Sequence, residues 1–208
     1  AKVPRGSGES EGEFERWWPV IQFAGKDNLR QQSAMWQAML LSAGLEPSRQ
    51  TIIHGFITSG GQKMSKSLGN VIDPIALMDE YGTDALRYYL ARHVHPFEDS
   101  DVTVESFREA YNANLANGLG NFVARVMKLA QSTKHKAQST KPRNKKLLDS
   151  PENAKQVYHA AFGAYHIQNA TNAVWKLVQT GDEYVQETRP WESEKPDVLE
   201  DLMALLGE

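Results

Sequence analysis

Residues 60–70, "GGQKMSKSLGN", gather two lysines and two serines in a short segment that also contains three glycines. Lys63 and Lys66 offer two ammonium groups three residues apart, and Ser65 and Ser67 add hydroxyl donors. A triphosphate carries several negative charges, and reaction at its α-phosphate develops charge on the departing pyrophosphate. Lysines that contact the phosphates mainly in the transition state would lower that barrier. The segment is therefore a candidate phosphate-binding loop.

The same composition also fits a solvated basic turn. Glycine and lysine are common in turns that bind nothing, and the P-loop pattern G-x-x-x-x-G-K-[ST] is absent from the chain. Composition alone leaves both interpretations open, so the neighbouring elements have to decide between them.

The residues before the loop predict a β-strand, a helix and a second β-strand. The apolar run 20–24 ends at Gly25, and the β-branched run 51–57 leads into the loop, so both are typical of buried strands. Apolar residues recur at helical spacing over 28–43, and Gly44 ends that pattern. In such a unit the strands are parallel, and ligands gather at their carboxyl ends. Gly25 and the loop lie at those ends.

Helices are predicted immediately after the loop. Asp73 and Pro74 are suited to be the N-cap and first residue of a helix that ends at Gly82, and Thr83 is suited to cap the next one. A long apolar stripe predicts helix over 104–131.

The helical pattern continues to the end of the chain. Gly118 and Gly120 lower the helix propensity of the long stretch, so a break or a close approach is expected there. One helix is predicted over 152–188, stopped by Pro190, and a last one over 196–208, whose apolar face we expect to be uncovered.

The fold class predicted from these patterns is α/β followed by all-α. We expect a tail or linker over residues 1–13 and part of a nucleotide-binding domain over 14–60. The loop and its connecting helices occupy 61–103, and an incomplete helical bundle occupies 104–208.

Composition limits the classes of function. The net charge of −3 provides no general attraction for nucleic acid, so any such contact must come from a local patch. The absence of cysteine excludes disulfides and thiolate metal sites, and no zinc is expected. No apolar run reaches the roughly 20 residues that span a bilayer, and no secretory leader is visible. We expect a cytoplasmic protein that is not attached to a membrane.

Two further polar clusters have alternative interpretations. A basic connector could contact RNA phosphates or be a solvated linker; it comprises Lys134, Lys136, Lys141, Arg143, Lys145 and Lys146. His93 and His95, near Glu98 and Asp99, could bind a metal, although their spacing is irregular for such a site.

Lys63 to Ser67, K-M-S-K-S, is identical to the KMSKS signature of class I aminoacyl-tRNA synthetases, and "GTDALRYYL" resembles the helical segment that follows it. "QFAGKD" resembles the I-G-K-D strand end of methionyl-tRNA synthetases, and "HGF" resembles their H-G-[FWY]. "YVQETRPWE" resembles the Y-x-x-x-x-x-P-W segment of their anticodon-binding bundle. Residues 14 to 200 therefore resemble the C-terminal half of this family in its bacterial form.

The resemblance implies a fold and an activity. The fold would be the C-terminal half of a Rossmann-like nucleotide-binding domain followed by a helical-bundle anticodon-binding domain. The activity would be that of an aminoacyl-tRNA ligase, which activates methionine with ATP and transfers it to tRNA(Met), with Mg²⁺ accompanying the ATP. The partners implied are methionine, ATP, tRNA(Met) and the N-terminal half of the enzyme.

The resemblance also implies residue roles at the nucleotide site. Lys63 and Lys66 would be catalytic, stabilising the triphosphate while methionyl-adenylate forms. The positions that match ATP-binding residues of the family are Gly25, Asp27, His54, Gly55, Met64, Ser65 and Ser67. Gly25 and Asp27 match positions near the ribose and the substrate amino group. The alternative for His54 is a core histidine bonded to backbone.

Three residues of the helical part match anticodon-binding positions of the family. Asn121 and Arg125 are four residues apart and share one helix face. Trp191 follows Pro190 and matches a tryptophan on which an anticodon base stacks, a contact worth about 1–3 kcal/mol. The alternatives are a solvated pair for Asn121 and Arg125 and a packing anchor for Trp191.

The chain departs from the family pattern in several places. The H-I-G-H motif, the half that carries it and the zinc-bearing insertion are absent, so we expect this chain alone not to form methionyl-adenylate. Gln31 and Gln32 replace the usual Phe-His, and Asp182 replaces an Asn. Two alternatives stay open: a leucyl-, isoleucyl-, valyl- or cysteinyl-type synthetase, and a non-catalytic tRNA-binding module. Gly25 to Asp27 together with Pro190 and Trp191 argue against the other synthetases.

Overall fold

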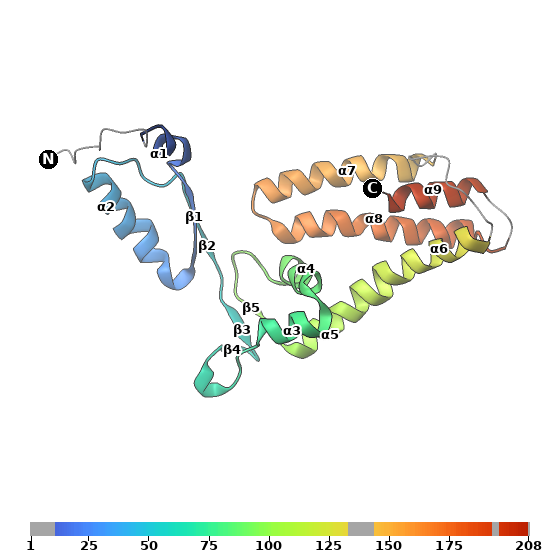
Figure 1. The fold of residues 1–208 in the computed structure, drawn as a ribbon, viewed down its shortest axis with the longest axis horizontal. Coiled ribbons are helices and arrows are strands. Elements are labelled where there is room, and N and C mark those ends of the chain that lie inside the picture. The colour runs from blue at the N-terminus through green and yellow to red at the C-terminus, as the bar shows by residue number, and fades with distance from the viewer. Residues whose placement is uncertain (1–10, 133–143, 193–195, 208) are drawn as a thin grey trace. The chain divides into compact units, whose positions relative to one another are not determined.

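The structure is a computed structural model that describes residues 11–132, 144–192 and 196–207. The chain forms two compact units (Figure 1). Residues 1–63 and 95–101 make the first, called here the α/β unit, and residues 64–94 and 102–208 make the second, the helical unit.

The α/β unit contains the predicted strand–helix–strand unit. The described chain starts with α1 (Glu11–Trp17), and β1 (Ile21–Gly25) then pairs in parallel with β2 (Gln50–His54). Helix α2 (Trp36–Ser42) lies between the two strands in sequence and ends near Gly44, whose φ of 75° places it in the left-handed region. A short 3₁₀ turn and a single π turn precede α2.

A second, three-stranded sheet completes the α/β unit. Its order is β4 (Gln62–Lys63), β3 (Ile57–Ser59) and β5 (Ser100–Asp101), with β3 antiparallel to β4 and parallel to β5. Segment 95–101 therefore returns from later in the sequence to pair with β3.

The prediction that the first strand is buried is wrong for part of its length. Ala24 is buried, but the side chain of Phe23 is 64% exposed. In the described residues β1 has only β2 as a neighbour, and a two-stranded sheet cannot cover both of its faces.

The first helices of the helical unit follow the predicted caps closely. Helix α3 (Pro74–Tyr81) begins at Pro74, and the Asp73 side chain accepts a hydrogen bond of 2.9 Å from the Ile75 N–H. Gly82, with φ of 88°, separates α3 from α4 (Thr83–His93). The predicted cap at Thr83 is wrong, because Gly82 occupies the cap position and Thr83 is already helical.

The long helical stretch is continuous but changes its winding. Helix α5 (Val104–Ala110) passes into a π-helical segment, Tyr111–Gly120, and then into α6 (Asn121–Ser132). The expected irregularity therefore lies where the glycines are. A Cβ at Gly118 would lie 3.3 Å from the Trp175 ring, so this glycine also permits a close approach.

The single helix predicted over 152–188 is instead two helices. Helix α7 (Lys145–Gly163) and helix α8 (Ile167–Thr188) are joined by a tight turn in which Tyr165 has a φ of 62°. Figure 1 shows α7 and α8 side by side, and they pack along their length. Gly163, the last residue of α7, is the sequence signal that could have located this turn.

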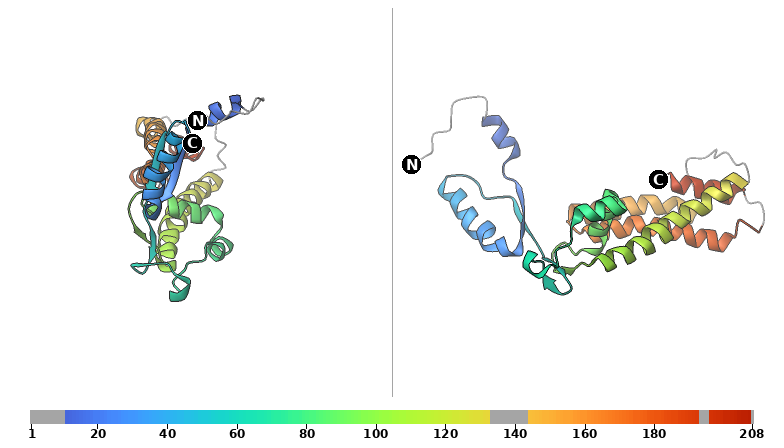
Figure 2. Two further views of the ribbon diagram at one scale, coloured as in Figure 1. Left: turned by 90° about the vertical axis from the view of Figure 1, so that its left-hand side faces the viewer. Right: turned by 60° about the horizontal axis from the view of Figure 1, so that its bottom comes forward.

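The apolar face of the last helix, α9 (Pro196–Leu206), is covered, which corrects the expectation of an open face. It packs against α6, α7 and α8, and the right-hand view of Figure 2 shows α6 and α9 beside the α7–α8 pair. The shared core consists of Phe122, Val126, Leu147, Tyr184, Val185, Val198, Leu199, Leu202 and Leu205.

A buried hydrogen bond also links α8 to α9. The Tyr184 hydroxyl donates to Asp201 Oδ2 at 2.9 Å, and the Asn144 N–H donates to Asp201 Oδ1 at 3.3 Å. Burial, helped by the bond to Asp201, raises the pKa of Tyr184 well above its ordinary value. A partnered carboxylate in an apolar core therefore specifies how these helices meet.

Gly181 sets the distance between α8 and its neighbours. A Cβ at this position would lie 2.3 Å from Phe122 Cζ and 3.0 Å from Leu205 Cδ2. We expect Gly181→Ala to lower the free energy of unfolding of the helical unit by about 2–3 kcal/mol, because Phe122 is buried and cannot move aside. Hydrogen exchange of the α8 amides would measure the change, because it reports on the helical unit alone. Gly163→Ala is the control, since nothing lies within 4 Å of its Cβ position, and equal losses for both variants would contradict the prediction.

Candidate functional site

The first half of the candidate loop is a β-hairpin turn. Gly60 and Gly61 have φ of 63° and 72°, as a two-residue turn between antiparallel strands requires. Asp101 Oδ1 accepts hydrogen bonds of 2.8 Å from the Gly61 N–H and from the Thr58 hydroxyl. The bond from Gly61, followed by that from Thr58, lowers the pKa of Asp101. These two glycines are therefore explained by the turn itself, and Lys63 follows at its end.

The second half of the loop is a 3₁₀ turn, Lys66–Leu68, closed by Gly69 at φ 66°. Ser65 precedes it, and its N–H donates to Asn70 Oδ1 at 2.8 Å. The Ser65 and Ser67 hydroxyl oxygens lie 2.7 Å apart, so one donates to the other. The Lys66 side chain is exposed. The loop is thus locally folded, while the side chain of Lys66 faces solvent.

Three of the predicted nucleotide-site residues meet at the carboxyl edge of the β1–β2 sheet. Gly25 is paired with His54 in the strand register. A Cβ on Gly25 would lie 2.8 Å from Asp27 Oδ1 and 3.7 Å from His54 Cε1. Both Asp27 and His54 are exposed at this edge. The strand register therefore assembles a polar cluster from residues that are 27 apart in the chain (54 − 27).

The interpretation of His54 as a core histidine bonded to backbone is wrong about burial, although the contact with backbone is present. The side chain is exposed, and Nδ1 lies 3.0 Å from the carbonyl oxygen of its neighbour Gly55. That contact requires the proton to be on Nδ1 if it is a hydrogen bond. The imidazole of His54 thus lies beside the backbone at the end of β2.

Gly55 is required by chain packing. A Cβ at this position would lie 2.1 Å from the Glu98 carbonyl oxygen and 2.6 Å from the Asp99 nitrogen. The segment that carries Asp99 therefore crosses directly over Gly55, and only glycine leaves room for it. This requirement exists whether or not a nucleotide is bound.

Phe56 and Asp99 are neighbours of this edge that sequence reasoning did not assign to the nucleotide site. Lys26 Nζ forms an ion pair with Asp99 Oδ2, and the Phe56 N–H donates to Asp99 Oδ1 at 2.8 Å. Lys26 Nζ lies 4.6 Å from the centre of the Phe56 ring, and Lys63 Nζ lies 5.1 Å from it. The bond from Lys26, followed by that from Phe56, lowers the pKa of Asp99. The only sequence signal for Phe56 was its place in "HGF".

The metal-site alternative finds no support. Among the described residues, no group of three or more His, Asp or Glu side chains is placed to hold a metal ion. The His95 Nδ1 accepts from the Phe97 and Glu98 N–H groups at 3.2 and 2.9 Å, and so closes a turn. His93 stacks on Tyr89 with ring centres 5.2 Å apart.

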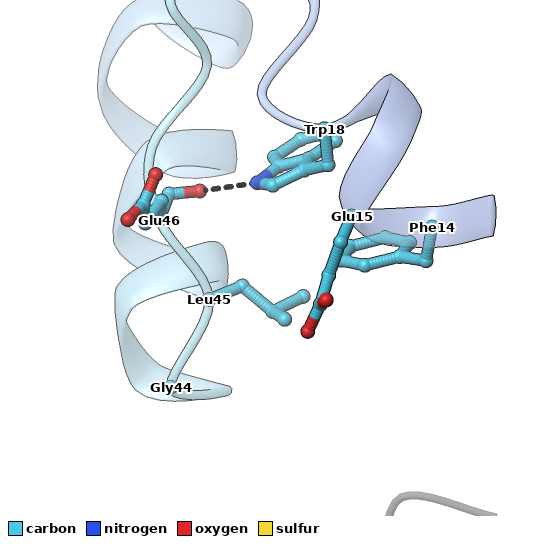
Figure 3. A pocket seen from close by; sticks show the side chains of 6 residues that line it. All are labelled: Phe14, Glu15, Trp18, Gly44, Leu45 and Glu46. Atoms are coloured by element: carbon cyan, nitrogen blue, oxygen red, sulfur yellow. Dashed lines mark hydrogen bonds between the residues drawn. The ribbon is translucent and has the colours of Figure 1, made fainter. Parts of the chain in front are cut away.

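A pocket of about 440 Å³ lies on another part of the α/β unit (Figure 3). Its lining comprises Phe14, Glu15, Trp18, Gly44, Leu45 and Glu46. The Trp18 Nε1–H donates to the Glu46 carbonyl oxygen at 2.9 Å across it. Residues 14–18 lead into β1 and residues 44–46 lead into β2, so this pocket lies at the amino ends of the strands. Ligands of such sheets bind at the carboxyl ends, and none of the predicted site residues lines it.

In the helical unit, Arg125 is held by an ion pair. Asn121 and Arg125 both lie on α6, and Arg125 Nη2 is 2.9 Å from Asp182 Oδ1 on α8. The side chains of Arg125 and Asp182 are 37% and 34% exposed, so the pair is partly solvated and contributes at most about 1 kcal/mol to stability. The alternative of a solvated pair holds for Asn121, which is exposed, whereas Arg125 is partly exposed and also has an ion-pair partner.

Trp191 lies beyond the end of α8 and is open to solvent. Arg189, with φ of 43°, terminates the helix, and Pro190 follows it. The Trp191 side chain is 53% exposed, which does not fit a packing anchor. Asp182, the ion-pair partner of Arg125, precedes Thr188, the last residue of α8, by about 9 Å along the helix axis, at 1.5 Å per residue.

Most of the basic connector cannot be compared with the structure. Lys134, Lys136, Lys141 and Arg143 lie outside the described residues, and Lys145 is the first residue of α7.

Gln31 and Gln32, which replace the usual Phe-His, lie in the π turn before α2. No described helix is both long and apolar enough to cross a membrane.

The described chain thus combines a parallel strand–helix–strand unit with a lysine loop and a set of packed helices. The family described as "tRNA synthetases class I (M)" matches residues 2–127, which is more than half of the chain. The chain belongs to this family, and the predicted class I synthetase fold is confirmed.

Named relatives agree with the family match. The methionine--tRNA ligase of Thermosynechococcus vestitus is 38% identical over 184 residues, covering 86% of this chain and 35% of the relative. That of Thermotoga maritima is 33% identical over 207 residues, covering 97% of this chain and 33% of the relative. The chain thus spans about a third of the length of these relatives.

Solved structures are similar as well. The Mycobacterium tuberculosis methionyl-tRNA synthetase bound by methionyl-adenylate has a TM-score of 0.84 and 29% identity. The match covers 96% of this chain and 42% of that one. The free form of the same synthetase has a TM-score of 0.79 and 25% identity.

Proposed function

We propose that this chain supplies the lysine loop and the anticodon-binding helices of a methionyl-tRNA synthetase. In this role it takes part in the ATP-dependent activation of methionine and its transfer to tRNA(Met). It acts together with the half of the enzyme that carries the H-I-G-H motif; the support for this part is that the chain spans about a third of the length of its relatives. The proposed location is the cytoplasm.

The proposed domain arrangement follows the sequence. Residues 14–60 contribute the C-terminal half of a Rossmann-like nucleotide-binding domain, after a tail over 1–13. Residues 61–103 carry the KMSKS loop and its connecting helices. Residues 104–208 form the anticodon-binding helical bundle.

The observation that carries the catalytic part of this proposal is the contact of Lys26 and Lys63 with one Phe56 ring. Lys26 directly follows β1, so this contact links the loop to the carboxyl edge where Gly25 and His54 meet. Ligands of parallel sheets bind at that edge. A nucleotide there would have its phosphates within reach of the Lys63 ammonium.

The residues divide into proposed roles. Lys63 and Lys66 neutralise the charge that develops on the departing pyrophosphate. Gly25, Asp27, His54 and Gly55 form the floor of the nucleotide site, and Met64, Ser65 and Ser67 contribute from the loop. ATP enters with Mg²⁺, which brings its own charge to the phosphates, and no residue of this chain is assigned as its ligand.

Anticodon binding is proposed for Asn121, Arg125 and Trp191. An exposed indole at the end of a helix can stack on an unpaired base, and stacking is how single-stranded RNA is commonly read. Arg125 is already oriented by Asp182, which also places a negative charge beside it. RNA that approaches Arg125 therefore has to compete with this carboxylate.

A binding experiment on this chain tests the anticodon part of the proposal. Fluorescence anisotropy would compare an anticodon stem-loop with a CAU loop and one with a changed loop. We expect Trp191→Ala to weaken CAU binding about 5- to 150-fold, which corresponds to about 1–3 kcal/mol of stacking. We expect Asp182→Asn to strengthen it, because Arg125 is released and a negative charge is removed.

The control is Trp17→Ala, which removes another exposed tryptophan, 66% exposed, from the α/β unit. It should leave binding unchanged. Equal affinities for wild type and Trp191→Ala, or equal losses for the two tryptophan variants, would refute the anticodon role.

A further inference from the structure

Phe56 is the ring on which two loops of the α/β unit meet. It lies between β2 and β3, with Lys26 Nζ 4.6 Å and Lys63 Nζ 5.1 Å from its ring centre. Both distances lie inside the range of roughly 6 Å over which an aromatic face attracts a cation. Lys26 follows β1, whereas Lys63 ends β4. One side chain therefore gathers two ammonium groups that the sequence keeps far apart.

The backbone holds this ring in place. The Phe56 N–H donates to Asp99 Oδ1 at 2.8 Å, and the Phe56 carbonyl oxygen accepts from the Ser100 N–H at 2.9 Å. Its neighbour Gly55 is fixed beneath the Glu98 carbonyl. With both of its backbone groups bonded to the crossing segment, the backbone that carries the ring is fixed at this edge.

A carboxylate also lies beside the ring. Asp99 Oδ2 pairs with Lys26 and offsets the charge of that ammonium group. The Lys63 ammonium approaches the same ring at the end of the hairpin. Two unscreened ammonium groups would repel each other, and Asp99 together with the negative face of the ring reduces that repulsion.

The contact between the Phe56 ring and the Lys63 ammonium is weak enough to be broken when a stronger ligand binds. At an exposed site, a cation–ring contact favours the bound arrangement only about two- to fivefold. A multiply charged phosphate attracts an ammonium much more strongly than a ring does. The ring can thus orient Lys63 beforehand and still release it to a polyphosphate.

We propose that Phe56 is a positioning residue for Lys63. Its ring keeps the ammonium of Lys63 at the carboxyl edge of the sheet, beside Lys26, until the polyphosphate of a nucleotide takes it over. The part that concerns the polyphosphate rests on the function proposed above for Lys63, whereas the ring contact does not. Phe56 itself need not touch the substrate.

NMR of this chain labelled with ¹³C-lysine tests the ring contact directly. We expect the ε-methylene protons of Lys63 to be shifted upfield by the Phe56 ring, relative to those of the exposed Lys176 on α8. This comparison needs no variant. Phe56→Leu should abolish the shift, Phe56→Tyr should retain it, and Phe23→Leu, another exposed phenylalanine of the same unit, should leave it unchanged.

Titration with inorganic tripolyphosphate then tests the transfer. We expect the Lys63 signals to move towards unshifted values as the anion binds. Phe56→Leu should bind it about two- to fivefold more tightly, because the ring contact that the anion has to break is already absent, and Phe56→Tyr should restore the wild-type affinity. A purely structural role for Phe56 would not be rescued by a ring in this way.

The two possible failures are distinguishable. If the Lys63 protons resonate with those of Lys176 in the wild-type chain, the positioning role is overturned, whatever the anion does. If they are shifted by the ring but do not respond to tripolyphosphate, the phosphate role proposed for Lys63 is overturned, and the transfer with it.

Discussion

We expect replacement of both Lys63 and Lys66 by glutamine to lower the rate of methionine-dependent ATP–pyrophosphate exchange by about 1,000-fold or more. The protein measured is the complete enzyme that joins this sequence to the H-I-G-H half of the family. Removing one preorganised donor from a transition state commonly costs about 100- to 1,000-fold, so two lysines should exceed that range. Glutamine removes the charge and stays polar, with a side chain that is one bond shorter than that of lysine.

The loss should fall mainly on kcat. Both lysines lie in a loop whose own hydrogen bonds fix its shape without them, through Asp101, Asn70 and the Ser65–Ser67 contact. The role proposed for their charges is an interaction that strengthens in the transition state, and such an interaction raises kcat without tightening substrate binding. Steady-state exchange at varied ATP would separate kcat from KM.

Lys176→Gln is the matched control. This lysine is 61% exposed and faces Glu183 on α8 in the helical unit. It should leave the exchange rate unchanged. If the double variant retains full exchange while binding ATP normally, the KMSKS loop does not act on the phosphates in this protein.

The second large effect is expected at Gly55. Gly55→Ala should destabilise the α/β unit by about 3 kcal/mol, because the new Cβ would lie 2.1 Å from the Glu98 carbonyl oxygen and 2.2 Å from its carbon. These are backbone atoms and cannot rotate away. Moving the crossing segment would also break the bonds of Phe56 to Asp99 and Ser100.

Hydrogen exchange is the appropriate measurement, because the chain has two units and a global unfolding curve would combine them. We expect faster exchange of the Phe56 and Ser100 amides in Gly55→Ala, with the α8 amides unchanged. Gly25→Ala is the control at the same sheet edge. Its Cβ would meet only the end of the flexible Asp27 side chain, so it should cost less than about 1 kcal/mol. Equal protection in both variants would contradict the packing argument.

The lysine pair and Gly55 lie close together in the sequence, but we expect the lysines to act in catalysis and Gly55 to act in packing. Lys63 and Lys66 can be replaced without touching the fold of their loop, whereas Gly55 cannot be replaced without moving its neighbours. A loss of activity in Gly55→Ala therefore says nothing about contact with a nucleotide. Stability has to be measured before that residue is counted as a nucleotide ligand.

The sequence by itself determined the features encoded by neighbouring residues. The KMSKS signature identified the family, and the alternation of strand and helix patterns predicted the parallel pair of β1 and β2. Asp73 and Gly82 predicted the two ends of α3 correctly, because a cap is satisfied within a few residues of itself. The turn between α7 and α8 was missed because Tyr165 adopts a positive φ that its residue type does not signal.

Only the tertiary structure decided which distant residues meet. The contact of Lys26 and Lys63 with Phe56, the close approach at Gly55 and the ion pair of Arg125 with Asp182 all join separate elements. The cover over the apolar face of α9 is of the same kind. Such contacts depend on how strands and helices pack, and a local pattern of residue types contains no record of that packing.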